Sequence, residues 1–129
     1  MTSMQAAALW VGLNIILLVY LSFRVGAART RYKVNLGDGG NPEMVKAIRT
    51  HANYTEYAPA ALLGLVLLAS LGAGTLVIHC LGAVFLVARV CHLLGLGMGV
   101  WPTGRMVGIL FTVLTLVATA GFLLYYALY

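Results

Sequence analysis

The stretch YAPAALLGLVLLASLGAGTLVIHCLGAVFLVA, residues 57–88, contains no Asp, Glu, Lys or Arg. A helix needs about 20 apolar residues to cross a hydrocarbon core about 30 Å thick. The stretch is therefore long enough for most of two helices, with the turn Leu71–Gly74 between them. Because this turn is short and uncharged, we expect a hairpin of two membrane-spanning helices whose turn lies on the non-cytoplasmic side.

Two more stretches without charged residues, 1–23 and 106–129, are long enough to add a helix each. Hydrophobic residues make up 62% of the chain and charged residues 9%, whereas soluble domains have about 25% charged residues. The sequence thus predicts an all-α integral membrane protein: one domain, residues 1–129, with four transmembrane helices in a bundle. Their expected bounds are about 4–23, 42–70, 75–95 and 103–128. A signal peptide typically begins with a basic segment. No such segment precedes the first predicted helix, so we expect this helix to be a retained span.

Basic residues concentrate in one segment, since six of the eight fall within residues 24–49, which follow the first predicted span and include the start of the second predicted helix. The positive-inside rule places this first loop in the cytoplasm and, with four spans, both termini outside. This placement accounts for the net charge of +5 without a nucleic-acid partner.

Asn41-Pro42-Glu43 is typical of a helix start. No spacing of residues indicates a metal site.

The cytoplasmic half of the second predicted helix contains polar residues that an ordinary span lacks. Arg49, Asn53 and Glu56 are spaced i, i+4, i+7 and share one face, whereas His51 points roughly the opposite way. Such residues are costly in a membrane and indicate a functional site. A structural interpretation is also open, in which Glu56 pairs with an arginine and Asn53 bridges two helices in a buried polar network.

The third and fourth predicted helices bring further cations to the same depth. Arg89 and His92 share one face of the third helix, and Arg105 opens the fourth. Together with Arg49, these arginines face one carboxylate, Glu56. An excess of buried guanidinium groups is costly unless an anion neutralises it. The sequence therefore predicts an anionic ligand at the cytoplasmic end of the bundle, held by forked donors.

The string Arg49-x-His51-x-Asn53-x-x-Glu56-Tyr57-x-Pro59 resembles the signature of the MAPEG family, the membrane-associated proteins in eicosanoid and glutathione metabolism. The resemblance extends over nearly the whole chain, through the four spans, the basic first loop, Arg89 and Arg105, and is closest to a bacterial branch. It implies a homotrimer in the bacterial inner membrane. The active sites of such a trimer lie between subunits and open to the cytoplasm and to membrane lipid.

The resemblance also implies a co-substrate, glutathione, and a role for each matching residue. By position, Arg105 matches the arginine that stabilises the glutathione thiolate, and a cation beside a thiol does favour its reactive anion. Either Arg29 or Arg24 could match the basic residue that the family carries in the first loop. The residues expected to bind glutathione are Arg29, Arg49, His51, Asn53, Glu56, Tyr57, Arg89 and His92.

The resemblance predicts a glutathione-dependent transferase or peroxidase that attacks a hydrophobic small molecule or lipid entering from the membrane. The chain departs from the family in two ways. His92 and Leu96 occupy positions where family enzymes often carry two tyrosines, and Met106 replaces a residue with a hydroxyl group after Arg105. One alternative is a non-catalytic protein that binds lipid or glutathione. Another is a small proton-coupled transporter that uses Glu56.

Overall fold

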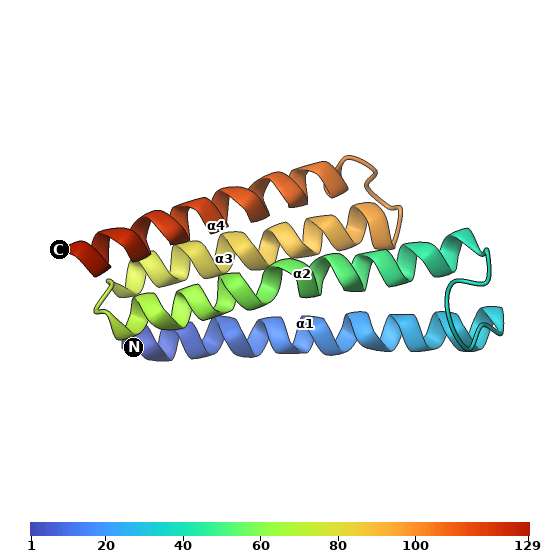
Figure 1. The fold of residues 1–129 in the computed structure, drawn as a ribbon, viewed down its shortest axis with the longest axis horizontal. Coiled ribbons are helices and arrows are strands. Elements are labelled where there is room, and N and C mark those ends of the chain that lie inside the picture. Colours follow the sequence, from blue (N-terminus) through green and yellow to red (C-terminus); the bar gives the residue numbers. More distant parts are fainter.

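The computed structural model describes residues 1–129 as four long helices, without strands. The helices are α1 (Ser3–Tyr32), α2 (Pro42–Ser70), α3 (Thr75–His92) and α4 (Gly104–Leu128), and a π-helical turn, η1 (Leu93–Gly97), continues α3. Successive helices run in opposite directions, so both termini and the α2–α3 turn lie at one end of the bundle (Figure 1). The α1–α2 loop and the connection from η1 to α4 lie at the other end, which we call the loop end.

Three of the helices are long and apolar enough to cross a membrane: α1, α3 together with η1, and α4. The composition of α2 is more polar, because its first half carries the string of residues 49–56. It nevertheless connects the two ends of the bundle, since α1 ends where α2 begins and α2 ends where α3 begins (Figure 1). Large apolar side chains such as Phe23, Leu76 and Leu114 are exposed on the outside of the bundle, as contact with lipid requires.

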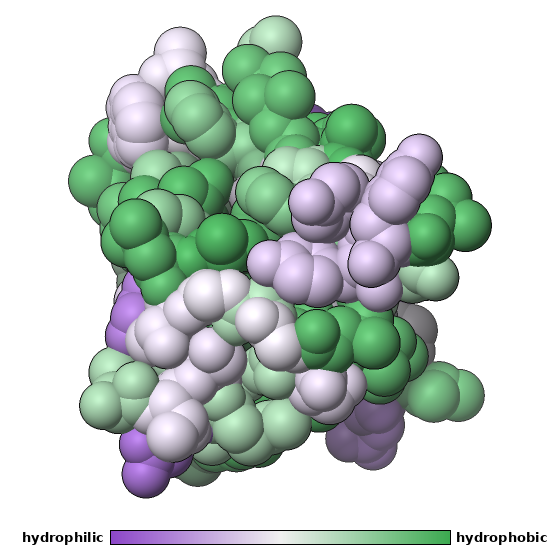
Figure 2. Space-filling view, turned by 90° about the vertical axis from the view of Figure 1, so that its left-hand side faces the viewer, coloured by the Kyte–Doolittle hydropathy of each residue, from purple (hydrophilic) through white to green (hydrophobic).

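Charge is distributed very unevenly between the two ends. Every Asp, Glu, Lys and Arg lies at the loop end or no farther from it than the middle of its helix, with Glu56 at that middle point. Figure 2 shows the opposite end, where hydrophobic and weakly polar surface predominates. The bundle thus has one end able to bind charged molecules and one end that is almost without charge.

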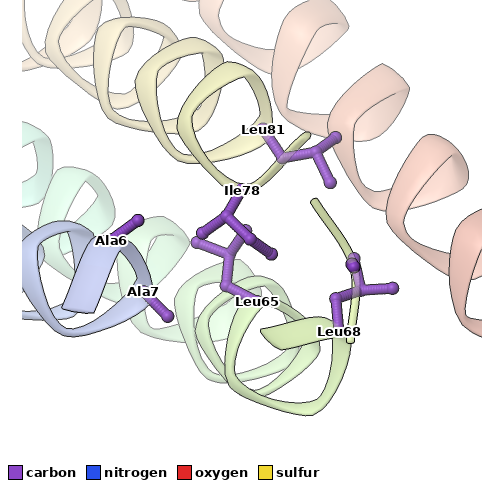
Figure 3. Close-up of a cluster of buried hydrophobic side chains, with 7 residues drawn as sticks. Ala6, Ala7, Leu65, Leu68, Ile78 and Leu81 are labelled. Carbon is purple, nitrogen blue, oxygen red and sulfur yellow. The ribbon is translucent and has the colours of Figure 1, made fainter. Parts of the chain in front are cut away.

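Two clusters of buried apolar side chains hold the helices together. The cluster near the termini joins α1, α2 and α3, and several of its side chains converge in Figure 3. Its members are Ala6, Ala7, Leu65, Leu68, Ala73, Ile78 and Leu81. The second cluster lies closer to the loop end and includes Tyr54 of α2, Phe85 of α3 and Leu93 of η1. This second cluster lies between the polar residues of the loop end and the first cluster.

The expected end of the first helix, at about residue 23, is wrong: α1 continues to Tyr32. The helix stops only where Lys33 adopts the left-handed conformation, with φ 56°, and its amide donates to the carbonyl of Arg29. Charged residues from 24 onward mark the end of the apolar segment, and the helix itself extends beyond it. Consequently Arg24 and Arg29 lie on α1 and not in a loop.

The other helix ends agree closely with the bounds expected from the sequence. α2 begins as expected, since the side chain of Asn41 accepts hydrogen bonds from the amides of Glu43 and Met44, and Pro42 is the first helical residue. The α-helical part of α3 ends at His92, three residues before the expected bound, because the glycine-rich segment after it forms the wider π-helical turn. α4 begins at Gly104, within one residue of the expected bound.

Candidate functional site

A cavity of about 260 Å³ opens at the loop end between α2, the end of α3 and the start of α4. Its polar lining comes from three helices, so residues far apart in sequence share one space. The lining residues are Val45, Lys46, Arg49, Asn53, His92, Leu96, Arg105 and Ile109. No carboxylate is among them, so every charged group that lines the cavity is a cation.

Helical spacing explains the α2 side of the cavity, and glycines explain the α4 side. Residues 45, 49 and 53 follow one another at intervals of four along one face of α2. A Cβ atom on Gly95 would clash with the amide nitrogen of Arg105, and one on Gly108 would lie 2.6 Å from the amide nitrogen of His92. Only glycines allow α4 to approach so closely, and this approach places Arg105 beside the end of α3.

Neither salt bridge of the protein involves Arg89 or Arg105. Lys46 Nζ lies 2.6 Å from Glu43 Oε1, and Arg49 Nη1 lies 3.8 Å from Glu56 Oε1, both with largely exposed side chains. Exposed pairs of this kind contribute little to stability. Arg105, which lines the cavity, and Arg89, which lies behind it, have no such partner, so the excess of cations at the loop end is not neutralised within the chain.

Arg89 lies behind the cavity and is only 2% exposed. Its Nη2 donates to Asn53 Oδ1 (2.8 Å) and lies 3.3 Å from His92 Nδ1, and its Nη1 donates to Thr112 Oγ1 (3.3 Å). Its guanidinium carbon also lies 5.8 Å from the centre of the Tyr54 ring, within the range of a cation–π interaction. The structural network considered from the sequence therefore exists in part: Asn53 bridges α2 and α3, whereas Glu56 pairs with Arg49 at the surface and the buried cation is held by neutral groups.

Tyr54 fastens this region to α1. Its hydroxyl donates to the backbone carbonyl of Asn14 (2.8 Å) and lies 3.1 Å from the Asn14 side-chain oxygen. The side-chain NH₂ group of Asn14 in turn donates to the backbone carbonyl of Trp10 (2.9 Å). Both Tyr54 and Asn14 are buried, which agrees with the packing role that a lone asparagine in a span is expected to have.

Comparison with known proteins identifies this architecture. The model of the MAPEG family matches residues 7–125, nearly the entire chain. The chain belongs to the MAPEG family. Two curated relatives, each called "Inner membrane protein YecN", come from Escherichia coli strain K12 and from Escherichia coli O6:H1, and both are 39% identical over 91 residues. These residues are 70% of this chain and 70% of each relative. No solved structure matches this chain.

As a MAPEG protein, the chain is a helical membrane protein, and its cavity brings together four of the nine residues that the sequence nominated. Arg49, Asn53, His92 and Arg105 line it, and Arg89 contacts two of them from behind. Lys46 also lines the cavity and was not nominated. It lies three residues before Arg49 and on the same face of α2, so helical spacing could have identified it.

The remaining nominated residues lie outside this cavity. Arg29 Nη1 donates to the carbonyls of residues 34, 35 and 37, which holds the α1–α2 loop against α1. His51 Nε2 lies 3.1 Å from Ser22 Oγ of α1, on the opposite side of α2 from Asn53, as the helical spacing predicts. Glu56 is exposed beside Arg49, and the Tyr57 ring lies 6.0 Å from the Arg89 guanidinium carbon.

Proposed function

We propose that this MAPEG protein binds glutathione at the loop-end cavity and activates its thiol as the thiolate. The observation that carries the proposal is that Arg49 and Arg105 line a cavity without a carboxylate. Glutathione has two carboxylates and gains a third negative charge when its thiol ionises. Forked guanidinium donors suit carboxylates. Both arginines are exposed, contrary to the burial expected from the sequence, and are therefore accessible to a ligand from solution.

Within this proposal Arg105 stabilises the thiolate, and Arg49, Asn53 and His92 bind the carboxylates and amides of the tripeptide. Arg105 is suited to this role because it has no hydrogen-bond or salt-bridge partner within the chain and lines the cavity. The thiolate sulfur attacks the electrophilic carbon of an apolar substrate. A carbon–sulfur bond forms, the leaving group departs with its bonding electrons, and the thiol proton passes to water. With a hydroperoxide, two glutathione molecules supply two electrons and give a disulfide, an alcohol and water.

The nominated residues outside the cavity favour a homotrimer with shared sites. Glu56 lies beside Arg49 at the edge of the cavity, whereas Arg29 and His51 contact other parts of the same protomer. A ligand in the cavity could meet Arg29 and His51 only through rearrangement or from a neighbouring subunit. A trimer with the loop end in the cytoplasm supplies such neighbours and gives glutathione access from the cell interior. Its expected location is a bacterial inner membrane, in line with the name of the Escherichia coli relatives.

The decisive test measures glutathione bound to the purified protein in detergent, by its thiolate absorbance and by conjugation to an aryl halide. Arg105→Ala is expected to lower the thiolate absorbance and the conjugation rate, and Arg105→Lys, which keeps a cation, is expected to restore part of both. Arg31→Ala, which removes an exposed arginine outside the cavity, serves as the control and is expected to match the wild type. Unchanged conjugation in Arg105→Ala would exclude the proposed mechanism.

A non-catalytic glutathione-binding protein is the second candidate, and Leu96 favours it. This apolar residue lines the cavity at a position where family enzymes often carry a tyrosine, so the cavity has one hydrogen-bond donor fewer near the sulfur. The same experiment separates the two candidates, because calorimetric binding without thiolate absorbance or turnover indicates binding alone. A transporter based on Glu56 is less well supported, since this carboxylate is exposed and lies 3.8 Å from Arg49.

A further inference from the structure

The hydrogen bonds that Arg89 donates determine how its neighbours are oriented. A guanidinium group only donates hydrogen bonds, so each atom that it contacts must accept. Asn53 therefore turns its oxygen toward Arg89 and its NH₂ group away, and His92 accepts at Nδ1 and must carry its hydrogen on Nε2. Thr112 also accepts, since its own hydrogen is donated to the carbonyl of Gly108 (2.7 Å).

The groups that Asn53 and His92 turn away from Arg89 are free to reach the cavity that both residues line. The buried side-chain atoms without a hydrogen-bond partner are Arg24 Nη1 and Arg89 Nε. Asn53 Nδ2 and His92 Nε2 are not among them and have no partner within the chain, so they are accessible in the cavity. Together with Arg49 and Arg105, they give the cavity an inner wall of nitrogen–hydrogen donors only.

We infer that Arg89 is a positioning residue that sets the polarity of the cavity, because it fixes Asn53 and His92 as donors toward the ligand. The inference deepens the proposed function and rests on it only in taking glutathione as the ligand. A wall of donors selects acceptor groups such as carboxylates and a thiolate. It disfavours a neutral amide of the same size, whose NH₂ group would face these donors without an acceptor.

The first test concerns the imidazole alone and needs no ligand. Nitrogen-15 NMR of histidine-labelled protein in detergent distinguishes the two imidazole tautomers, and His92→Gln assigns the His92 signals. The wild type is expected to hold His92 with its hydrogen on Nε2. Arg89→Met is expected to release this restraint, so that the Nδ1-protonated tautomer becomes detectable. A wild-type His92 with its hydrogen on Nδ1 would overturn the inference.

The second test uses Asn53→Asp, which keeps an oxygen facing Arg89 and replaces the cavity-facing NH₂ group with an oxygen. A purely structural role of the Arg89–Asn53 contact predicts unchanged glutathione binding, because a carboxylate is a better partner for Arg89. The polarity inference predicts retained folding and an affinity for glutathione lower by about 10-fold to 100-fold. Asn35→Asp, the same change in the exposed loop, is the matched control and is expected to bind as the wild type does.

A third measurement compares glutathione with its glycine amide in the wild type and in Arg89→Met. The wild type is expected to prefer the acid, and Arg89→Met is expected to reduce that preference. Glutathione that fails to bind the wild type would contradict the proposed function, whereas the tautomer of His92 would still decide the inference. Equal binding of glutathione to the wild type and Asn53→Asp would contradict the inference and the role proposed for Asn53, and it would leave the proposed thiolate role of Arg105 intact. If Arg89→Met fails to fold, the wild-type tautomer and Asn53→Asp suffice.

Discussion

Replacing Gly108 with alanine tests whether the approach of α4 to α3 builds the cavity. The added methyl group would lie 2.5 Å from the carbonyl oxygen of Ala88 and 2.6 Å from the amide nitrogen of His92, whereas ordinary contacts begin at 3.4 Å. α4 must therefore retreat by about 0.9 Å (3.4 − 2.5), because both neighbours are backbone atoms that cannot rotate away. Overpacking of this kind costs about 1–3 kcal/mol.

The expected result is a lower midpoint of thermal unfolding in detergent and a weaker affinity for glutathione. Affinity falls because the retreat of α4 separates Arg105 from His92, which line the cavity from opposite helices. The matched control is Gly121→Ala on the same helix, where a Cβ atom meets nothing within 4 Å. This control is expected to unfold at the wild-type temperature or slightly above it, since alanine favours helix over glycine by up to about 1 kcal/mol.

The result that would refute this reasoning is a Gly108→Ala protein as stable as Gly121→Ala. It would mean that α3 and α4 do not approach as closely as the backbone distances indicate. A protein that is destabilised and yet binds glutathione as the wild type does would contradict only the functional part. In that case Arg105 and His92 would not act on the same ligand.

Two more substitutions test contacts around the site. Tyr54→Phe removes the buried hydrogen bonds to Asn14 and is expected to destabilise the protein by about 1–3 kcal/mol, measured as a lower unfolding midpoint; Tyr129→Phe, on a residue 96% exposed, should leave the midpoint unchanged. Arg29→Ala removes the donor to three carbonyls within residues 34–37 and is expected to accelerate amide hydrogen exchange throughout the α1–α2 loop. Unchanged exchange there would show that Arg29 does not hold the loop.

Helical spacing predicted the faces of α2 well. The sequence placed Arg49 and Asn53 on one face and His51 on the opposite face, and the structure places the first two in the cavity and His51 against Ser22 of α1. Spacing succeeds here because α2 is a continuous helix, in which the position of a residue in the sequence determines the direction of its side chain. The structural interpretation left open from the sequence is correct for Asn53, which bridges α2 and α3 by accepting a hydrogen bond from Arg89.

Other features depend on contacts that one sequence does not reveal. The end of α1 could not be derived from hydropathy, because residues 24–32 contain three arginines and are still helical. The arginine that pairs with Glu56 was likewise left open. Glu56 faces outward beside Arg49, while Asn53 lies one turn from it and contacts Arg89 of α3. Which of two neighbours a cation contacts is decided by the packing of α2 against α3.

The polar composition of α2 is itself an argument about function. α2 is the one long helix without an apolar window sufficient for a membrane span, although the fold requires it to connect the same two ends as α1, α3 and α4 (Figure 1). A helix that only packed in the bundle could be as apolar as its neighbours, because apolar side chains form both buried clusters. Polar groups in such a helix are costly and are retained where a structural network uses them, as for Tyr54, or where a ligand does. The low hydropathy of α2 therefore supports the proposed site on this helix, and replacing Arg49 and Asn53 with leucine is expected to abolish glutathione binding while the bundle still inserts.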